Sequence, residues 1–485
     1  METMTSCNMA TLAPYVPTTD NPWDVEKARH LYRRLGFGTT EANINTILNG
    51  TPQAAVDTLV NNAINLPNTA APAWGYWSFS DYDNYPDQSN EQRNIWYRQA
   101  ATDIQNKDVK GRLSFFWLNH FVTQLESYNH PPYMYQYWDA LQTHSLGNFK
   151  TFVSEMGLNP AMLLMLNGFE NTNTSPNENY ARELYELFSL GEDNGYTQQD
   201  IEETSRALTG YNHWDDFGGT IFFDESTFDS SPKTIFGQTG NWGYDDVMDI
   251  LFEQKADLIA TFICEKLYRY FVSPVISESI IDSLKEIFIT GNWEIAPVLS
   301  TLFKSAHFFD FNANGHLIKS PYDLVVTYLN ELNMTVDVSD EDYYNFVVYL
   351  TAMLGQDIFE PIDVAGWQRN QDWINTSTLS GRWLSLEFIT WPFWNHDSDQ
   401  FRQFAINLTG NSNDPYFIAR TIIDFFVPRP LFTTSEYDIA TDVFKWNVPQ
   451  GYYDDGSWNL DWEGADYQVL MLFHHIFRMP EFQLK

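Results

Sequence analysis

The chain has 485 residues, of which 44% are hydrophobic and 19% charged, so it is long enough to bury a large core. Its 27 basic and 64 acidic residues give a formal net charge of −37. That charge repels phosphate backbones and anionic lipid headgroups, which excludes a general nucleic-acid-binding protein. Two cysteines, Cys7 and Cys264, are too few for a disulfide-stabilised scaffold.

The sequence carries no sign of a membrane segment. No apolar run approaches the ~18–20 residues that span a bilayer, so we predict no membrane insertion. The first residues, METMTSCNMATLAPY, lack a basic start and a continuous apolar stretch, so we recognise no signal peptide. Cytoplasmic location is the default expectation, and export by another route is the alternative.

The predicted elements begin after a flexible tail, residues 1–20. Asn21 and Pro22 open a helix that Gly36 and Gly38 close. Apolar residues at i, i+3 and i+4 spacing predict further helices. These helices span 40–49, 52–63, 90–124, 133–145, 148–157, 176–190, 198–208, 244–253, 255–272, 276–289, 294–305, 321–332, 340–354, 376–390, 414–425 and 463–477.

The segment 211–243 breaks this pattern, because glycines and short β-favouring runs such as TIFF interrupt the helices. It predicts a β-hairpin or long loop that crosses from a front lobe, 21–210, to a back lobe, 244–485. The predicted fold is mainly α, a large multi-helix assembly with one short β or loop insertion. We expect a single body, 21–485, rather than separable domains.

Several short segments, in order along nearly the whole chain, resemble one known family. The segments are LYRRLGFG (31–38), FWLNHF (116–121), HSLGNF (144–149), NPAMLLMLNG (159–168), PNENYARELYELFSLG (176–191), YTQQDIEETSRALTGY (196–211), PKTIFGQTG (232–240), IKSPYDLVV (318–326), PIDVAGW (361–367), DWINTSTL (372–379) and MPEFQLK (479–485). Together they resemble the bacterial family known as domain of unknown function 1800. The resemblance implies no established activity. It does imply a protein partner with a phosphatase-like fold, because members are often encoded beside such proteins.

The stretch 176–191 concentrates charge on a predicted helix. Asn179, Glu183 and Glu186 share one face with Arg182 alongside, and the next helix repeats the pattern with Glu203 and Arg206. Apolar residues flank both helices. Three interpretations stay open: an internal ion-pair lattice, an active or binding site built on that lattice, and a solvated face.

If the region is catalytic, paired carboxylates point to acid–base hydrolysis of a glycan-like or other neutral polymer. Glu183 and Glu203 would be acid and base, with Arg182 and Arg206 tuning them and His120 orienting the substrate. Aromatic and amide side chains would hold the polymer through stacking and hydrogen bonds. The candidates for that role are Asn179, Trp242, Trp367 and Trp373.

Two alternatives accompany this hypothesis, so whether the protein is an enzyme stays open. A divalent metal is one, with His120, His144, Glu183 and Glu186 as ligands, although no Glu-x-x-His or His-Glu-x-x-His spacing supports it. The other is a non-enzymatic scaffold that binds a phosphatase-like protein. In that scaffold the Glu and Arg motifs would be purely structural.

Overall fold

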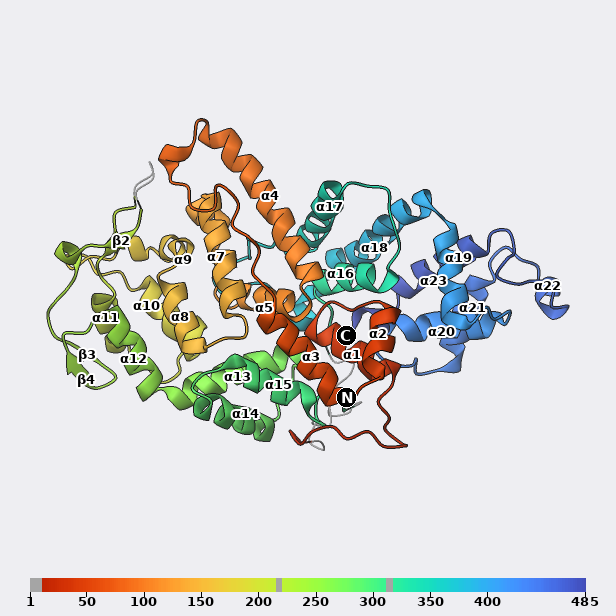
Figure 1. The fold of residues 1–485 in the computed structure, drawn as a ribbon, viewed down its shortest axis with the longest axis horizontal. Coiled ribbons are helices and arrows are strands. Elements are labelled where there is room, and N and C mark those ends of the chain that lie inside the picture. The colour runs from red at the N-terminus through yellow and green to blue at the C-terminus, as the bar shows by residue number, and fades with distance from the viewer. Residues whose placement is uncertain (1–10, 215–219, 311–316) are drawn as a thin grey trace.

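The computed structural model describes residues 11–214, 220–310 and 317–485 (Figure 1). In these residues α-helices dominate, and the strands form two small antiparallel sheets of two strands each. The mainly-α fold with a short β insertion near 211–243 is thereby confirmed. No helix in the described ranges is both long and apolar enough to span a bilayer.

The first half contains helices α1 (Val25–Leu35), α2 (Glu41–Leu48), α3 (Pro52–Asn65), α4 (Tyr85–Asn106), α5 (Asp108–Leu118), α6 (Leu125–Tyr128), α7 (Pro131–His144), α8 (Phe149–Gly157), α9 (Pro160–Met165), α10 (Asn179–Glu183) and α11 (Gln198–Ala207). A π-helical segment, η3 (Leu184–Ser189), continues α10. The strands are β1 (Tyr211–Asn212), β2 (Phe222–Phe223), β3 (Lys233–Ile235) and β4 (Gln238–Gly240).

The second half contains α12 (Tyr244–Gln254), α13 (Ala256–Phe271), α14 (Glu278–Thr290), α15 (Ile295–Lys304), α16 (Pro321–Leu332), α17 (Asp340–Met353), α18 (Thr376–His396), α19 (Asp399–Thr409), α20 (Pro415–Phe426), α21 (Thr434–Phe444), α22 (Gln450–Asp454) and α23 (Ala465–Phe477). Short 3₁₀ turns lie along the whole described chain, at η1 (Phe79–Asp81), η2 (Gly168–Glu170), η4 (Glu225–Thr227), η6 (Asn370–Trp373) and η7 (Glu481–Gln483).

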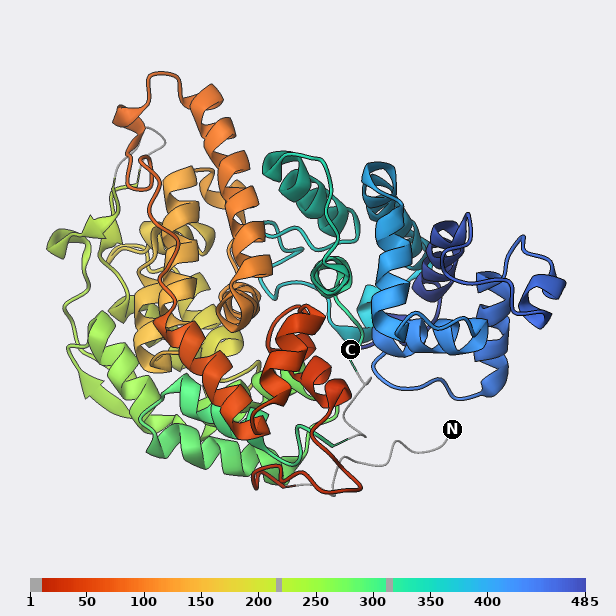
Figure 2. The same cartoon turned by 45° about the vertical axis from the view of Figure 1, so that its right-hand side comes forward.

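The helices occupy an elongated molecule whose two ends come from different parts of the chain. Helices α7–α15 fill one end, and α18–α23, in blue, fill the other (Figures 1 and 2). Helices α12–α15 pack on α3, α8 and η3 of the first half. Helices α1, α5 and α16 meet in the middle, and the last residue, Lys485, lies beside them.

Several predicted elements differ in detail from the structure. The single helix predicted at 90–124 is two helices, because Asp108 takes a left-handed conformation, φ +43°, between α4 and α5. The helix predicted at 176–190 is a short α-helix that widens into the π-helical η3. Helices α6, α9, α19, α21 and α22 were not predicted.

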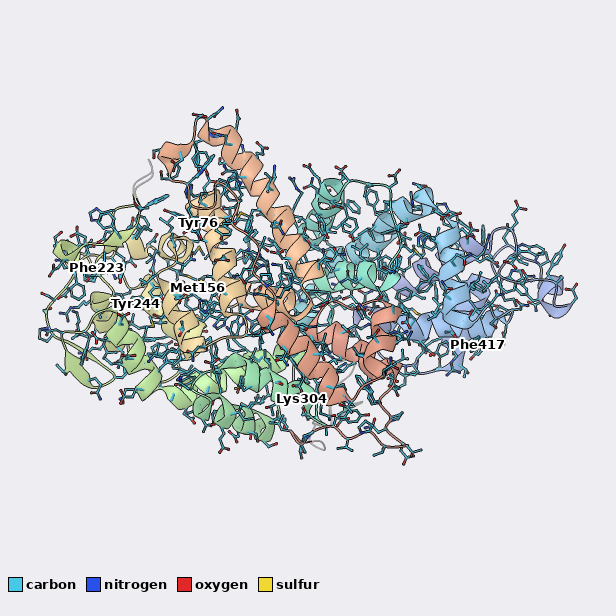
Figure 3. All side chains as sticks on the ribbon, viewed as in Figure 1. Tyr76, Met156, Phe223, Tyr244, Lys304 and Phe417 are labelled. Atoms are coloured by element: carbon cyan, nitrogen blue, oxygen red, sulfur yellow. The ribbon has the colours of Figure 1, made fainter. Side chains whose placement is uncertain are left out.

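The β insertion forms two hairpin-like pairs at one edge of the molecule. Tyr211 pairs with Phe223, and Lys233 pairs with Gly240, both antiparallel. Strand β3 packs on α11, and the following α12 returns to α8, where the Tyr244 hydroxyl donates a 2.7 Å hydrogen bond to the Ser154 carbonyl. Figure 3 shows Tyr244 beside Met156 of α8. The division into front and back lobes stays a prediction.

The first described residues, which fall within the predicted tail, lie against the body. The Tyr15 amide donates a 2.8 Å hydrogen bond to the Lys304 carbonyl, and the Ala306 amide donates one to Ala13. The Tyr15 side chain is buried. Contacts with the end of α15 therefore hold residues 13 and 15 in place.

An ion cluster of three buried side chains, Arg112, Asp323 and Lys485, joins the middle helices. Arg112 Nη2 lies 2.6 Å from Asp323 Oδ1, and Lys485 Nζ contacts Asp323 Oδ2. Arg112 also donates hydrogen bonds to the carbonyls of Arg33 and Gly36 at the end of α1. The cluster therefore connects α1, α5, α16 and the last residue.

Neighbouring arginines extend these connections to the C-terminal helices. Arg33 forms a two-point ion pair with Glu331 of α16, at 2.6 and 2.8 Å, and donates a 2.7 Å hydrogen bond to the Phe425 carbonyl of α20. Arg34 Nη2 donates a 2.6 Å hydrogen bond to the Lys485 carbonyl oxygen. Buried charges need such partners, since an unpaired one costs several kcal/mol.

Asp323→Asn should lower the free energy of unfolding by about 3–5 kcal/mol, because two buried cations lose their counter-charge. Burial alone would raise the pKa of Asp323, but Arg112 and Lys485 hold it well below its usual range. The Asp323 contribution is therefore present above the unfolded pKa of about 4 and is lost as pH falls further. Urea denaturation at pH 7 and at low pH measures it.

Asp249→Asn is the matched control, because Asp249 pairs with Lys150 at 2.6 Å on the surface. Its effect should stay within about 0.5 kcal/mol. Equal effects of the two substitutions would show that the buried cluster does not stabilise the fold.

Candidate active site

A cavity of about 270 Å³, which we call the junction cavity, lies where α5, α13, the start of α16, the segment 367–373 and Lys485 meet. Its walls combine aromatic rings with basic and amide side chains. They include Phe115, Phe116, Asn119, His120, Lys266, Arg269, Tyr270, Ile318, Ser320, Asp323, Trp367, Gln368, Arg369, Asn370, Trp373 and Lys485.

The cavity is cationic although the chain is strongly acidic. Lys266, Arg269, Arg369 and Lys485 line it, against one carboxylate, Asp323. That carboxylate is already paired with Arg112 and Lys485. Among the described residues, Arg369 forms no ion pair with a carboxylate. Lys485 is likewise paired with Asp323, and Arg269 pairs with Glu265 at 3.6 Å, so the charge of Arg369 is the one that would attract an anion.

Lys266 and His120 form a hydrogen-bonded pair at the wall of the cavity. Lys266 Nζ lies 2.9 Å from His120 Nδ1 and 3.1 Å from the Leu187 carbonyl oxygen. His120 Nε2 lies 3.2 Å from the Phe188 carbonyl oxygen. Because a carbonyl can only accept, Nε2 carries the hydrogen and Nδ1 accepts from Lys266.

The π-helical segment η3 supplies both carbonyl groups. The Leu190 amide bonds to the Tyr185 carbonyl, five residues back, at 2.8 Å, and Gly191 then ends the segment with φ +97°. Carbonyls in the last turn of a helix have no intrahelical partner, so Leu187 and Phe188 can accept from side chains. The stretch PNENYARELYELFSLG thus contributes to the site through its backbone.

Burial favours the uncharged forms of both His120 and Lys266. It lowers the pKa of His120 well below its usual value, and the positive charge of Lys266 lowers it further. Burial also lowers the pKa of Lys266 well below its usual value, and Arg369 adds to this effect. His120 is therefore a neutral imidazole, and Lys266 gives up its proton more readily than an exposed lysine.

Aromatic rings and one short loop shape the cavity. The Phe116 and Tyr270 ring centroids lie 4.9 Å apart, and those of Phe115 and Trp367 lie 5.1 Å apart. Asn119 Oδ1 accepts a 2.7 Å hydrogen bond from the Trp367 amide. Gly366, φ +94°, has no room for a side chain, since a Cβ atom would lie 2.2 Å from Asn119 Oδ1.

A second cavity of about 530 Å³ adjoins the first, and we call it the outer cavity. Both cavities are lined by His120, Lys266, Trp367, Gln368 and Arg369. Carboxylates also line the outer cavity, from Glu186, Glu192, Asp363 and Asp372. The Lys266–His120 pair therefore lies between a cationic cavity and a more acidic one.

Some of the predicted site residues gather here. His120, Trp367 and Trp373 line the junction cavity, and Glu186 lines the outer cavity. Among the segments on which the resemblance rests, those at 116–121, 318–326, 361–367, 372–379 and 479–485 each contribute at least one residue to the junction cavity. Residues far apart in sequence thus form one site.

The predicted Glu and Arg pairs lie outside both cavities, except for Glu186. Arg182 pairs with Glu178 at 3.0 Å and with Glu186 at 3.3 Å, along its own helical stretch. The side chains of these pairs are partly exposed. They therefore connect neighbouring turns of the helical stretch at the surface and do not form a fully buried lattice.

A similar set of ion pairs joins α11 to the β insertion. Arg206 pairs with Glu203 at 2.8 Å and with Asp229 at 2.9 Å. Glu203 also accepts a 2.9 Å hydrogen bond from the Thr234 amide of β3. Glu203 and Arg206 therefore hold β3 and the residues before it against α11.

The other candidates also lie away from the junction cavity. Asn179 begins α10, and the Trp242 indole donates a 3.1 Å hydrogen bond to the Gln238 carbonyl in its own turn. His144 Nε2 lies 2.7 Å from Glu155 Oε2. Within the parts of the chain that the structure describes, no group of three or more His, Cys, Asp or Glu could hold a metal ion. His120, His144, Glu183 and Glu186 are thus not gathered as a ligand set.

Sequence reasoning missed the basic residues of the site. Lys266 and Arg269 lie within a predicted amphipathic helix, where a lysine or arginine usually faces water. Of these basic residues, only Arg369 could have been predicted as a site residue from the sequence. It lies in AGWQRNQDW, between the two candidate binding residues Trp367 and Trp373. The clustering depends on tertiary contacts between α5, α13 and the 367–373 segment.

Glu183→Gln should raise the melting temperature at pH 7. Burial raises the pKa of Glu183, Glu186 raises it further, and Arg182 only partly opposes this. A carboxyl whose folded pKa is raised weakens the fold as pH rises, so the gain should vanish below the unfolded pKa of about 4.3. Thermal unfolding at both pH values measures it.

Glu203→Gln is the comparison, because Glu203 is paired with Arg206 and with the Thr234 amide. It should lower the free energy of unfolding by about 0.5–1 kcal/mol at pH 7. A loss of stability in Glu183→Gln at pH 7 would contradict the raised pKa of Glu183.

Comparison with known proteins gives one match. No curated protein and no solved structure matches the chain. The model of the family described as a protein of unknown function, DUF1800, matches residues 30–484. The match covers every segment that lines the junction cavity, apart from Lys485 itself. The chain belongs to the DUF1800 family.

Proposed function

We propose that the protein is an enzyme that acts on a small organic anion bound in the junction cavity. The observation that carries this proposal is the Arg369 guanidinium, which has no carboxylate partner among the described residues, in an aromatic cavity beside a lysine–histidine pair. Arg369, Arg269 and Lys485 would hold the anionic group, and the aromatic rings would contact a flat or apolar part. Lys266 and His120 provide the groups that can exchange protons.

The size of the cavity fits a small molecule better than a polymer. Its volume, about 270 Å³, is at the lower end of ordinary ligand sites. Among the lining residues, the aromatic rings outnumber the single carboxylate, so a compact aromatic or aliphatic acid would find both apolar and cationic contacts. The charge of Arg369 is not used by an ion pair within the described residues and is the leading contact for the anion.

The hydrolase hypothesis, with Glu183 and Glu203 acting on a neutral polymer, stays a prediction. Neither residue lines the junction cavity or the outer cavity. Glu203 is engaged by Arg206 and by the β3 backbone, which favours a structural role for that carboxylate. The junction cavity is therefore the stronger candidate for chemistry.

A scaffold that binds a protein partner is the second candidate, favoured by an exposed apolar face. On α18, Leu384, Phe388 and Trp391 are exposed at i, i+4 and i+7, and Tyr349 and Met353 of α17 are exposed as well. Phe388 and Phe346 of α17 lie with ring centroids 5.4 Å apart, so the two helices are neighbours there. Apolar patches of this kind often bind proteins. Co-purification with a phosphatase-like partner, lost in Phe388→Asp, is the expected result.

Binding of two matched probes tests the enzyme proposal. Phenylacetate and phenylacetamide have nearly the same shape, but only the first is an anion. We expect isothermal titration to show phenylacetate binding at least about tenfold tighter, since a charge-assisted hydrogen bond contributes about 1.5–3 kcal/mol. Equal affinities would contradict an anion site.

Arg369→Gln should weaken phenylacetate binding about tenfold or more, for the same reason. Arg420→Gln is the control, because it removes the same charge from a surface pair with Asp424 on α20. Unchanged binding in Arg369→Gln, or equal losses in both variants, would argue against the junction cavity as the binding site.

A further inference from the structure

We propose that the Lys266 amine is a nucleophile, and that it forms an imine with the carbonyl group of an organic anion held in the junction cavity. The inference rests on the proposed function and narrows the substrate class to aldehydes or ketones that carry an anionic group. It assigns to Lys266 a covalent role, with His120 as its proton acceptor.

The hydrogen bonds around Lys266 leave its lone pair available. In the neutral amine, one N–H points to His120 Nδ1 at 2.9 Å and the other to the Leu187 carbonyl at 3.1 Å. Both hydrogens are thereby held by protein acceptors. The remaining tetrahedral position carries the lone pair, and Lys266 lines both cavities. A carbonyl carbon bound in either cavity would face a wall that includes this amine.

The surroundings also favour the neutral amine that the reaction needs. Lys266 forms no ion pair with a carboxylate in the described residues, and its Nζ lies 4.6 Å from the centroid of the Phe262 ring. Burial and the nearby Arg369 lower its pKa. A desolvated lysine beside a second cation is a recognised way to activate an amine.

The reaction balances without an outside reagent. The Lys266 nitrogen bonds to the carbonyl carbon as the carbon–oxygen double bond opens to a hydroxyl. His120 Nδ1 accepts one N–H proton and returns it to the oxygen. The hydroxyl then leaves as water together with the second N–H hydrogen, and a carbon–nitrogen double bond forms. No atom is oxidised or reduced.

The cations of the cavity suit the anionic part of such a substrate. Arg369 lines the same two cavities as Lys266, so an acid group beside the carbonyl can contact Arg369 while the carbonyl faces the amine. A 2-oxo acid places these groups on adjacent carbons, and an aldehyde phosphate separates them further. Both belong to the proposed class.

Reductive trapping tests the inference. Protein is incubated with phenylpyruvate, or in a second arm with pyridoxal phosphate, and then treated with sodium borohydride, which converts an imine into a stable amine. Peptide mass spectrometry should find the added mass at Lys266 at least tenfold more often than at Lys255. The arm that labels more shows whether carboxylate or phosphate is preferred. Labelling of Lys266 no greater than that of Lys255 in both arms would overturn the inference.

Lys255 is a suitable internal standard, because its Nζ also lies over a phenylalanine ring, Phe236, at 4.4 Å, but outside both cavities. Lys266→Met should abolish the labelling, and Lys255→Met should leave it at Lys266. If Lys266→Met fails to fold, competition in the unmodified protein replaces it: phenylacetate should slow trapping at Lys266 and not at Lys255. Trapping at Lys266 that phenylacetate leaves unchanged would overturn the placement of the anion.

Different results would contradict the anion site and the imine at Lys266. If phenylacetate does not bind, the anion site itself is wrong. If phenylacetate binds and phenylpyruvate displaces it, yet borohydride traps nothing at Lys266, the anion site stands and the imine is wrong.

Discussion

The pairing of Arg112 with Asp323 and Lys485 is the interaction on which the rest of the structure depends. Three charges lie buried where α1, α5, α16 and the last residue meet, and each would be costly without the others. The same group forms part of the junction cavity, since Asp323 and Lys485 line it. The same ion pairs therefore stabilise the fold and form part of the wall of the junction cavity.

The site itself depends on a helix that ends irregularly. Segment η3 widens into a π-helix and ends before Gly191. The carbonyl oxygens of Leu187 and Phe188 therefore accept hydrogen bonds from Lys266 and His120. A regular helix continuing through this region would bond these carbonyls to its own amides. The local irregularity fixes the imidazole tautomer and the direction of the lysine amine, both of which matter for chemistry.

Sequence patterns predicted most helices, because amphipathic periodicity and caps are local. They did not predict the break at Asp108, which has no Gly or Pro to mark it. For the site, the short-range pairs of Arg182 with Glu178 and Glu186 could be predicted from i, i+4 spacing. His120, Trp367 and Trp373 were chosen as candidates from their aromatic segments and line the junction cavity, while their role stays a prediction. Lys266 and the pairing of Arg112 with Asp323 could not, since they depend on contacts between segments more than a hundred residues apart.

The place of Lys485 in the ion cluster affects how the chain can fold during synthesis. Asp323 cannot acquire both counter-charges until residue 485 has left the ribosome, at least 162 residues after Asp323 itself. At about 5–20 residues per second, that interval lasts on the order of ten seconds or more. For that time the nascent chain holds helices whose central charges are not fully paired. The junction cavity therefore acquires its full set of ion pairs only after residues 324–485 have been made.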